Sequence, residues 1–219
     1  MADQSALPAQ VFLDPLDVTP RLAELGLSDE LLLEAISNGA QHAYSCTAND
    51  PVMLPGTLFW GKTVRHLRDT LVPLGWRVDN TRNFATIVHP SGQWAVGVSS
   101  GDENTGRPAS SPHSRNPKGT VTKDIANQNQ MSFTEIAPDF MPPMASPPSP
   151  KSTWLLLFYS DRSTHEIRSE LSLPVEMDAA GRVVEWSQRL ILPSIPGPQT
   201  IVIEDHDQEI DFDVERRAL

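Results

Sequence analysis

The chain has almost no cysteine, no long apolar run and few basic residues. Cys46 is the only cysteine among 219 residues, so no disulfide can form within the chain, and a reducing cytoplasm is the expected compartment. No stretch approaches the roughly 20 apolar residues that a transmembrane helix requires. The N-terminal sequence MADQSALPAQVFLDPLD lacks the basic and apolar parts of a signal peptide. We therefore expect a cytoplasmic protein that does not bind a membrane.

Positive charge is also scarce. The chain holds 17 Lys and Arg against 28 Asp and Glu, a net charge of -11, which argues against direct binding to nucleic acid. Acid is concentrated near the C-terminus, where residues 204–215, EDHDQEIDFDVE, contain no Lys or Arg. This run is either the solvated face of an edge strand or the contact for a protein partner with a basic surface. In the second interpretation the contact residues are Asp205, Asp207, Asp211 and Asp213.

Apolar periodicity predicts helices first and strands afterwards. Residues 20–45 have an apolar face at helical spacing with Ser28 as N-cap, and residues 62–75 have a second one. Alternating or continuous apolar runs then predict three hairpins, 76–100, 166–193 and 200–215, and a central strand at 152–160. The expected fold is α+β, with two N-terminal helices packed on a mainly antiparallel sheet of about five to seven strands.

Proline-rich stretches divide the chain into four expected parts. Residues 1–20 are expected to form an irregular arm, and 21–137 to hold the helical pair, the first hairpin and a long polar loop. Residues 138–150 are a Pro-rich connector. Residues 151–219 form a C-terminal β meander, either as a separate domain or as one domain with the preceding part.

Residues 56–63, GTLFWGKT, match the phosphate-loop pattern G-x-x-x-x-G-K-[ST] at every fixed position. A working phosphate loop turns successive backbone N–H groups inward, which small residues allow, and it follows a buried strand. Here the variable positions include Leu58, Phe59 and Trp60, and the preceding CTANDPVMLP has no strand pattern. We interpret the segment as an aromatic anchor at the start of a helix that begins near Lys62.

Residues 101–123 form a long polar segment without apolar periodicity. A connection of this length is uncommon in a compact domain unless it carries a function or is disordered. Its basic side chains predict a site for a phosphate-bearing ligand or an acidic partner, and a surface excursion without a ligand is the alternative. The candidate ligand-binding residues are Arg107, Arg115, Lys118 and, on the second helix, Lys62.

No assembled catalytic or metal-binding motif is present. The six histidines are scattered, without H-x-x-x-H or H-E-x-x-H spacing, and no cofactor or metal is expected. Cys46 fits a buried structural cysteine better than a nucleophile. If the protein is an enzyme, Asp102 and His89 are the acid–base candidates, although Asp102 in GDENTG also fits an ordinary turn.

The middle third of the chain resembles a known group of sequences. The segments WGKTVRHLRDTLVPLGW, TRNFATIVHPSGQWAVGVSSGDENTG and NPKG are similar to an uncharacterised group of bacterial proteins associated with plasmids, prophages and genomic islands. The resemblance implies a bacterial or phage protein that works around mobile elements or host defence. It assigns no functional residue.

Two functions follow as expectations. The first is a non-enzymatic binding or regulatory protein that acts through protein contacts. An exposed strand edge would also allow pairing with a partner strand or with a second copy, giving a homodimer. The second is an enzyme acting on a nucleotide or nucleic acid, with phosphate held by the 101–123 loop.

Overall fold

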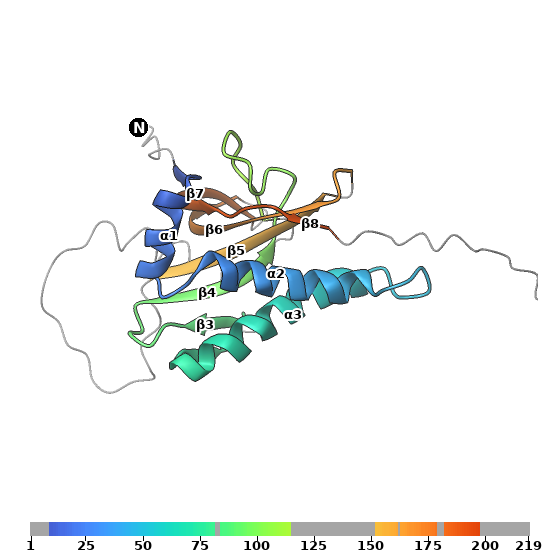
Figure 1. Cartoon of the computed structure of the whole chain (residues 1–219), viewed down its shortest axis with the longest axis horizontal. Coiled ribbons are helices and arrows are strands. Elements are labelled where there is room, and N and C mark those ends of the chain that lie inside the picture. The colour runs from blue at the N-terminus through green and yellow to red at the C-terminus, as the bar shows by residue number, and fades with distance from the viewer. Residues whose placement is uncertain (1–8, 82–83, 115–151, 162, 179–181, 198–219) are drawn as a thin grey trace, which may run out of the picture.

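The computed structural model describes residues 9–81, 84–114, 152–161, 163–178 and 182–197 (Figure 1). Three α-helices, α1 (Pro15–Glu24), α2 (Asp29–Tyr44) and α3 (Leu54–Leu71), are followed by a 3₁₀ turn, η1 (Val72–Leu74). Eight strands form one sheet: β1 (Gln10–Phe12), β2 (Arg77–Asp79), β3 (Thr86–Val88), β4 (Trp94–Ser100), β5 (Ser152–Asp161), β6 (Glu166–Met177), β7 (Val183–Ile191) and β8 (Ile195–Pro196).

The N-cap prediction for α2 is confirmed. Ser28 Oγ accepts a hydrogen bond from the backbone N–H of Leu31 at 3.2 Å, and Asp29 and Glu30 occupy the first turn, where the helix dipole favours negative charge. The residues that α2 buries recur at helical spacing: Leu32, Ala35, Ile36, Gly39, Ala40 and Ala43. One apolar face therefore fixes which side of the helix meets the core.

The prediction of an irregular arm is wrong for the described residues before position 21, which form β1 and most of α1. Pro15 is the first helical residue, where the missing N–H costs nothing, and Asp14 Oδ1 accepts from the Leu16 N–H at 2.9 Å. Proline therefore starts this helix rather than preventing it. The division of the chain into domains stays a prediction.

The sheet is mixed rather than mainly antiparallel, in the order β1-β7-β6-β5-β4-β3-β2 with β8 beside β6. The α+β class is confirmed, but three helices replace the expected two, eight strands replace five to seven, and β1 precedes the helices. The hairpins β3–β4 and β6–β7 are antiparallel as expected, whereas β4 pairs with β5 in parallel. The third expected hairpin, 200–215, lies outside the described residues. Parallel neighbours need a long crossover, and residues 101–151 connect these two strands.

All three helices lie on one face of the sheet (Figure 1). Trp154, Leu156 and Phe158 of β5 point to this face and share a core with α2 and α3. Their neighbours Leu155 and Leu157 point to the other face, as strand geometry requires, and form a smaller cluster whose other buried members are Val183 and Trp186.

Helices α2 and α3 cross very closely at Gly39. A Cβ added to Gly39 would lie 2.1 Å from Thr63 Oγ1 and 2.5 Å from the carbonyl oxygen of Phe59. Only glycine fits this crossing. The two helices therefore form a tight hairpin, which extends past the ends of β4 and β5 (Figure 1).

Candidate functional site

The segment GTLFWGKT is entirely helical, because α3 begins at Leu54 and continues to Leu71. A phosphate loop needs backbone N–H groups turned toward the ligand, whereas a helix interior uses these groups for its own hydrogen bonds. The prediction that the helix begins near Lys62 is wrong, because Pro55 lies at the helix start, where its fixed φ favours helix formation. Phe59 anchors this segment in the core, because its side chain is buried and stacks on Phe158 with ring centroids 4.0 Å apart. Trp60 is 39% exposed.

A groove opens where the helical hairpin extends past the sheet. It has a volume of about 640 Å³. One wall is the end of α2 together with the start of α3, and the other wall is the C-terminal ends of the parallel strands β4 and β5. The lining residues are Ala43, Tyr44, Val52, Met53, Pro55, Gly56, Thr57, Phe59, Trp60, Ser99, Ser100, Gly101, Phe158, Tyr159 and Ser160. We refer to this site as the hairpin groove.

Apolar side chains and hydroxyl groups together line the hairpin groove, and among the described residues no Asp, Glu, Lys, Arg or His lines it. Val52 is 96% exposed and Met53 81% exposed at its rim. Its polar groups are hydroxyls and backbone, and the Tyr44 hydroxyl is hydrogen-bonded to Ser160 Oγ across the two walls. Such a site suits an uncharged, mainly apolar ligand group, because a charged group would lose its hydration without receiving a counter-charge.

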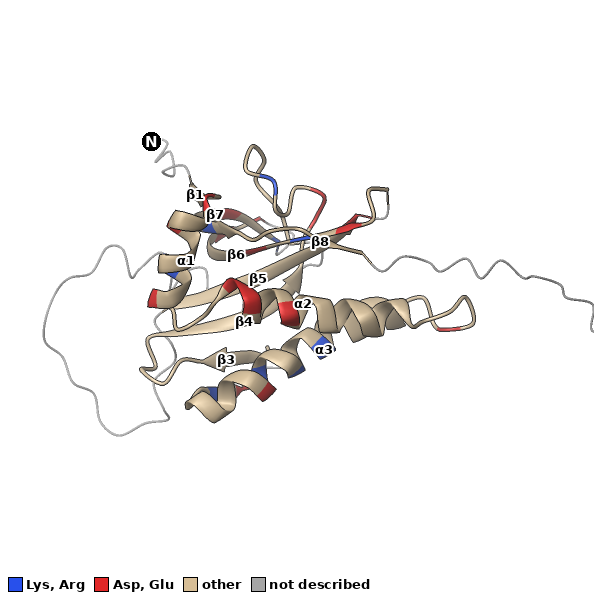
Figure 2. Ribbon diagram, viewed as in Figure 1, with Lys and Arg blue, Asp and Glu red and all other residues tan. Residues whose placement is uncertain are grey.

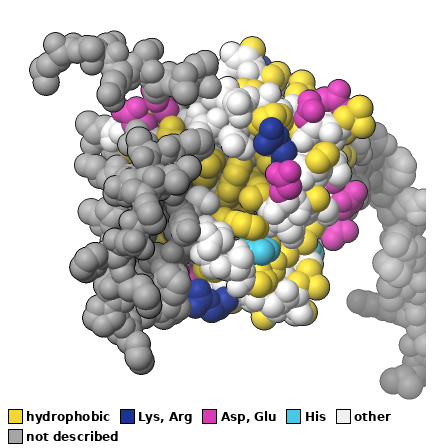
Figure 3. All heavy atoms as spheres, turned by 90° about the vertical axis from the view of Figure 1, so that its left-hand side faces the viewer, with side chains coloured by type: hydrophobic (Ala, Val, Ile, Leu, Met, Phe, Trp, Pro, Cys, Tyr) yellow, Lys and Arg dark blue, Asp and Glu magenta, His cyan; other side chains and the backbone are white. Residues whose placement is uncertain are grey.

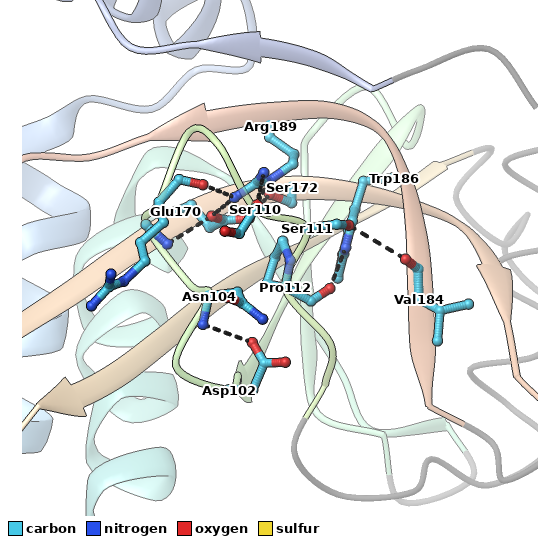
Figure 4. Close-up of polar contacts among 12 residues, drawn as sticks. Asp102, Asn104, Ser110, Ser111, Pro112, Glu170, Ser172, Val184, Trp186 and Arg189 are labelled. Carbon is cyan, nitrogen blue, oxygen red and sulfur yellow. Dashed lines mark hydrogen bonds and ion pairs between the residues drawn. The ribbon is translucent and has the colours of Figure 1, made fainter.

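On the opposite face of the sheet, a buried ion pair holds the first part of the 101–123 segment (Figure 4). Arg189 of β7 donates to both carboxylate oxygens of Glu170 on β6, at 2.6 and 3.0 Å, and both side chains are almost fully buried. Arg189 also donates to the carbonyl oxygens of Ser110 and Arg107, at 2.6 and 3.1 Å. This pair therefore fixes residues 102–114, which we name the clamped loop.

Further contacts close the clamped loop on the sheet. The Gly106 N–H donates to Glu170 Oε2 at 2.9 Å, and the Trp186 indole N–H donates to the Pro112 carbonyl oxygen at 2.8 Å. Gly106 has φ +72°, and a Cβ there would lie 2.9 Å from Arg168 Cβ. At position 106 the loop therefore packs too closely against the sheet for any residue but glycine. The described part of the loop is an ordered element of the fold.

Of the predicted phosphate-binding residues, the structure describes Lys62 and Arg107, and these two lie apart. Lys62 lies half-buried on α3, and it is not among the residues that line the hairpin groove. Arg107 is exposed in the clamped loop, on the sheet face away from α3. The remaining candidates, which include those for a basic partner, lie outside the described residues: Arg115, Lys118, Asp205, Asp207, Asp211 and Asp213.

His89 and Asp102 lie at opposite ends of β4, which is about 20 Å long at ~3.3 Å per residue. His89 stacks on Trp94 with ring centroids 4.2 Å apart, and its Nδ1 accepts from the Ser91 N–H at 3.1 Å. Burial lowers the pKa of His89 below its usual value. Asp102 instead contacts His113, with Oδ2 and Nδ1 3.1 Å apart within the clamped loop. The two side chains cannot serve one reaction.

Nucleophilic or metal chemistry receives no support from the described residues. Burial, together with the charge of Asp50, raises the pKa of the Cys46 thiol, which reduces its thiolate fraction and its reactivity. No group of three or more His, Cys, Asp or Glu side chains in the described ranges could hold a metal ion.

Two features of the candidate site region were not predicted from the sequence. Val52 and Met53, which line the hairpin groove, belong to the apolar run PVML. This run lies in a segment whose prolines predict a turn, and apolar residues in a turn were the sequence feature that indicated the groove. The ion pair was signalled by Glu170 and Arg189, which are charged residues inside strands of otherwise buried character. Charged residues are rarely buried unless they are paired.

The rest of the described surface is mixed in charge. Figure 2 shows Asp and Glu but no Lys or Arg along α2, whereas α3 carries residues of both signs. Within the described residues, no helix combines the length and hydropathy that crossing a bilayer requires. When the chain is compared with models of protein families, with curated proteins and with solved structures, it matches none of them.

Proposed function

We propose that this protein is a non-enzymatic binding protein whose hairpin groove takes up an uncharged, apolar segment of another protein. The observation that carries the proposal is the groove itself, which has a volume of about 640 Å³, exposes apolar side chains beside hydroxyl groups, and has no charged residue among its described lining residues. Ligand sites of this size are typically apolar with a few orienting polar groups. Here Tyr44, Ser100 and Ser160 supply those groups.

The exposure of the groove favours a protein partner. Val52 and Met53 project from the tip of the helical hairpin and are almost fully exposed. Methionine adapts its shape to irregular apolar partners and is common at protein-binding surfaces. An apolar side chain that enters between the hairpin tip and the sheet end would cover both residues, and the removal of this apolar area from water would drive binding.

Two broader parts of the proposal come from the sequence. The run containing Asp205, Asp207, Asp211 and Asp213 would add an electrostatic contact with a partner that has a basic surface, and this contact would weaken as salt is raised. The resemblance to proteins of plasmids, prophages and genomic islands suggests a cytoplasmic role around mobile elements or host defence. Neither part is needed for the groove to bind.

The test uses displayed peptide pools of three kinds: apolar and uncharged, acidic, and basic. We expect the purified protein to enrich the apolar, uncharged pool, and the selected peptides to change the fluorescence of Trp60, which lines the groove. Substitution of Val52→Asp together with Met53→Asp should abolish binding, because it places charge at the rim.

Leu16→Asp is the matched control, since Leu16 is 83% exposed and lies outside the groove. The Trp60→Phe variant shows whether the fluorescence change comes from the groove. Enrichment of a charged pool, or equal binding by the double variant and the unmodified protein, would overturn the proposal.

A further inference from the structure

Strand β2 ends the sheet on the side away from β1, and no described strand pairs with its outer edge. On its inner side Arg77, Val78 and Asp79 pair with Val88, Ile87 and Thr86 of β3. Arg68 of α3 fixes the strand end, because its guanidinium donates to the Asp79 carbonyl oxygen at 3.1 Å and to the Thr86 carbonyl oxygen at 3.0 Å. The end of the strand is therefore held in place, and the outer backbone groups of β2 offer a template for another strand.

Apolar surface gathers beside this edge. Val78 is 42% exposed, and Val72 and Leu74 of the preceding 3₁₀ turn are 43% and 65% exposed. Val64, Val72 and Val78 line a groove of about 470 Å³ between α3 and β2. In Figure 3, which looks at the end of the molecule where α3 terminates, apolar atoms make up much of the described surface. A strand that joined β2 would cover part of this surface.

The charges on β2 identify the strand that fits. In an antiparallel pair centred on Val78, Arg77 of one copy lies directly opposite Asp79 of the other, and the reverse pair forms as well. Directly opposite side chains on a sheet interact, and opposite charges there are favourable. The sequence Arg77-Val78-Asp79 is therefore complementary to itself.

We propose that β2 pairs antiparallel with β2 of a second copy, so that two sheets join into one across a two-fold axis. Such an interface is isologous, because each copy contributes the same surface. The axis is perpendicular to the joined sheet, so the helix layers of both copies lie on the same side. The two exposed valines of each copy, Val72 and Val78, then come together at the joint.

The other free edge of the sheet lacks this complementarity. Strand β1 consists of Gln10, Val11 and Phe12 and has no charged residue. Arg21 lies over the ring of Phe12, 3.9 Å from its centroid. The proposal therefore applies to β2 alone, and it does not depend on the hairpin groove.

The test is a charge-swap series measured by sedimentation velocity from micromolar to millimolar protein. The unmodified chain should show a concentration-dependent monomer–dimer equilibrium. Arg77→Asp and Asp79→Arg, each alone, place like charges opposite each other at both positions of the pair and should weaken self-association by about tenfold or more. An equimolar mixture of the two variants restores both opposite-charge pairs and should dimerise like the unmodified chain.

The mixture separates the pairing from any effect on folding, because each variant serves as the partner of the other. Asp79 Oδ1 accepts hydrogen bonds from the Thr81 N–H and hydroxyl, so circular dichroism must first show that Asp79→Arg is folded. A chain that stays monomeric at millimolar concentration would overturn the proposal. Self-association unchanged in both single variants, or a mixture that behaves like the singles, would overturn it as well.

Discussion

On one face of the sheet Leu156 and Phe158 pack beneath helices, whereas on the other Glu170 and Arg189 hold a loop by charge. The apolar face needs only residues of suitable size at the correct period, and many arrangements of such residues pack well. The charged face depends on two side chains that are both buried and that satisfy each other. Removal of one partner leaves an unpaired charge away from water. The two faces should therefore respond differently to substitution.

The largest effect is expected from Glu170→Gln. The variant keeps the shape of the side chain but leaves the Arg189 guanidinium buried without its counter-charge, and we expect a loss of about 3–5 kcal/mol in the free energy of unfolding. Urea denaturation measures this loss. Joint replacement by Glu170→Leu and Arg189→Met removes the unpaired charge and should recover part of the loss. A double variant less stable than Glu170→Gln would show that the hydrogen bonds from this pair to the clamped loop contribute more than the unpaired charge costs.

A somewhat smaller effect is expected on the helix-covered face. Leu156→Ala empties a fully buried site on β5 and should cost about 2–5 kcal/mol through lost burial and the resulting cavity. Leu156→Met is the matched control, because volume-conserving exchanges usually cost less than about 1.5 kcal/mol. Equal stability of the two variants would mean that this face is not tightly packed.

The clamped loop can be tested by its backbone. Gly106→Ala forces a side chain into a left-handed conformation and against Arg168 Cβ, so we expect a loss of about 1–3 kcal/mol. Gly56→Ala is the control, because a Cβ at Gly56 would meet no atom within 4 Å, and alanine favours a helix over glycine by about 0.5–1 kcal/mol. Hydrogen exchange should show faster opening of residues 102–114 in the first variant alone.

The smallest effect is a pH dependence at the helix-covered face. Burial lowers the pKa of His89 in the folded protein, so the unfolded chain binds the proton more readily. Stability should therefore be unaffected above the unfolded pKa of about 6.5 and should fall as the pH drops below it. His89→Gln removes this titration, and thermal melts of both proteins between neutral and mildly acidic pH isolate it. An identical acid dependence in the variant would contradict the assignment.

Local patterns predicted the elements whose residues decide their own conformation. Ser28 began α2, and the turn at 90–92 joined β3 to β4, because capping and turn chemistry act over a few residues. The parallel pairing of β4 with β5 was not predictable in this way, since it depends on where a connection of about fifty residues returns to the sheet. The helix at Pro15 was missed because proline is compatible with a helix start as well as with a break.

The candidate site was predicted less well than the fold. A pattern match drew attention to GTLFWGKT, and that segment does line a groove, through Gly56, Thr57, Phe59 and Trp60. The pattern suggests a site for a charged phosphate, whereas no charged residue is among the described residues that line this groove. Pairings between distant positions, such as Glu170 with Arg189, need the register of two strands and cannot be read from spacing.

Gly39 influences the shape of the hairpin groove, although it does not line the groove itself. Tyr44 on α2 and Phe59 on α3 both lie in the helical wall of the hairpin groove, and they belong to the two helices that Gly39 brings into contact. Any larger residue at position 39 would act as a wedge and alter the angle between these helices. The width of the hairpin groove is thus set by a residue that does not line it, and inherited variation at this one glycine would change the shape of the groove before any lining residue had changed.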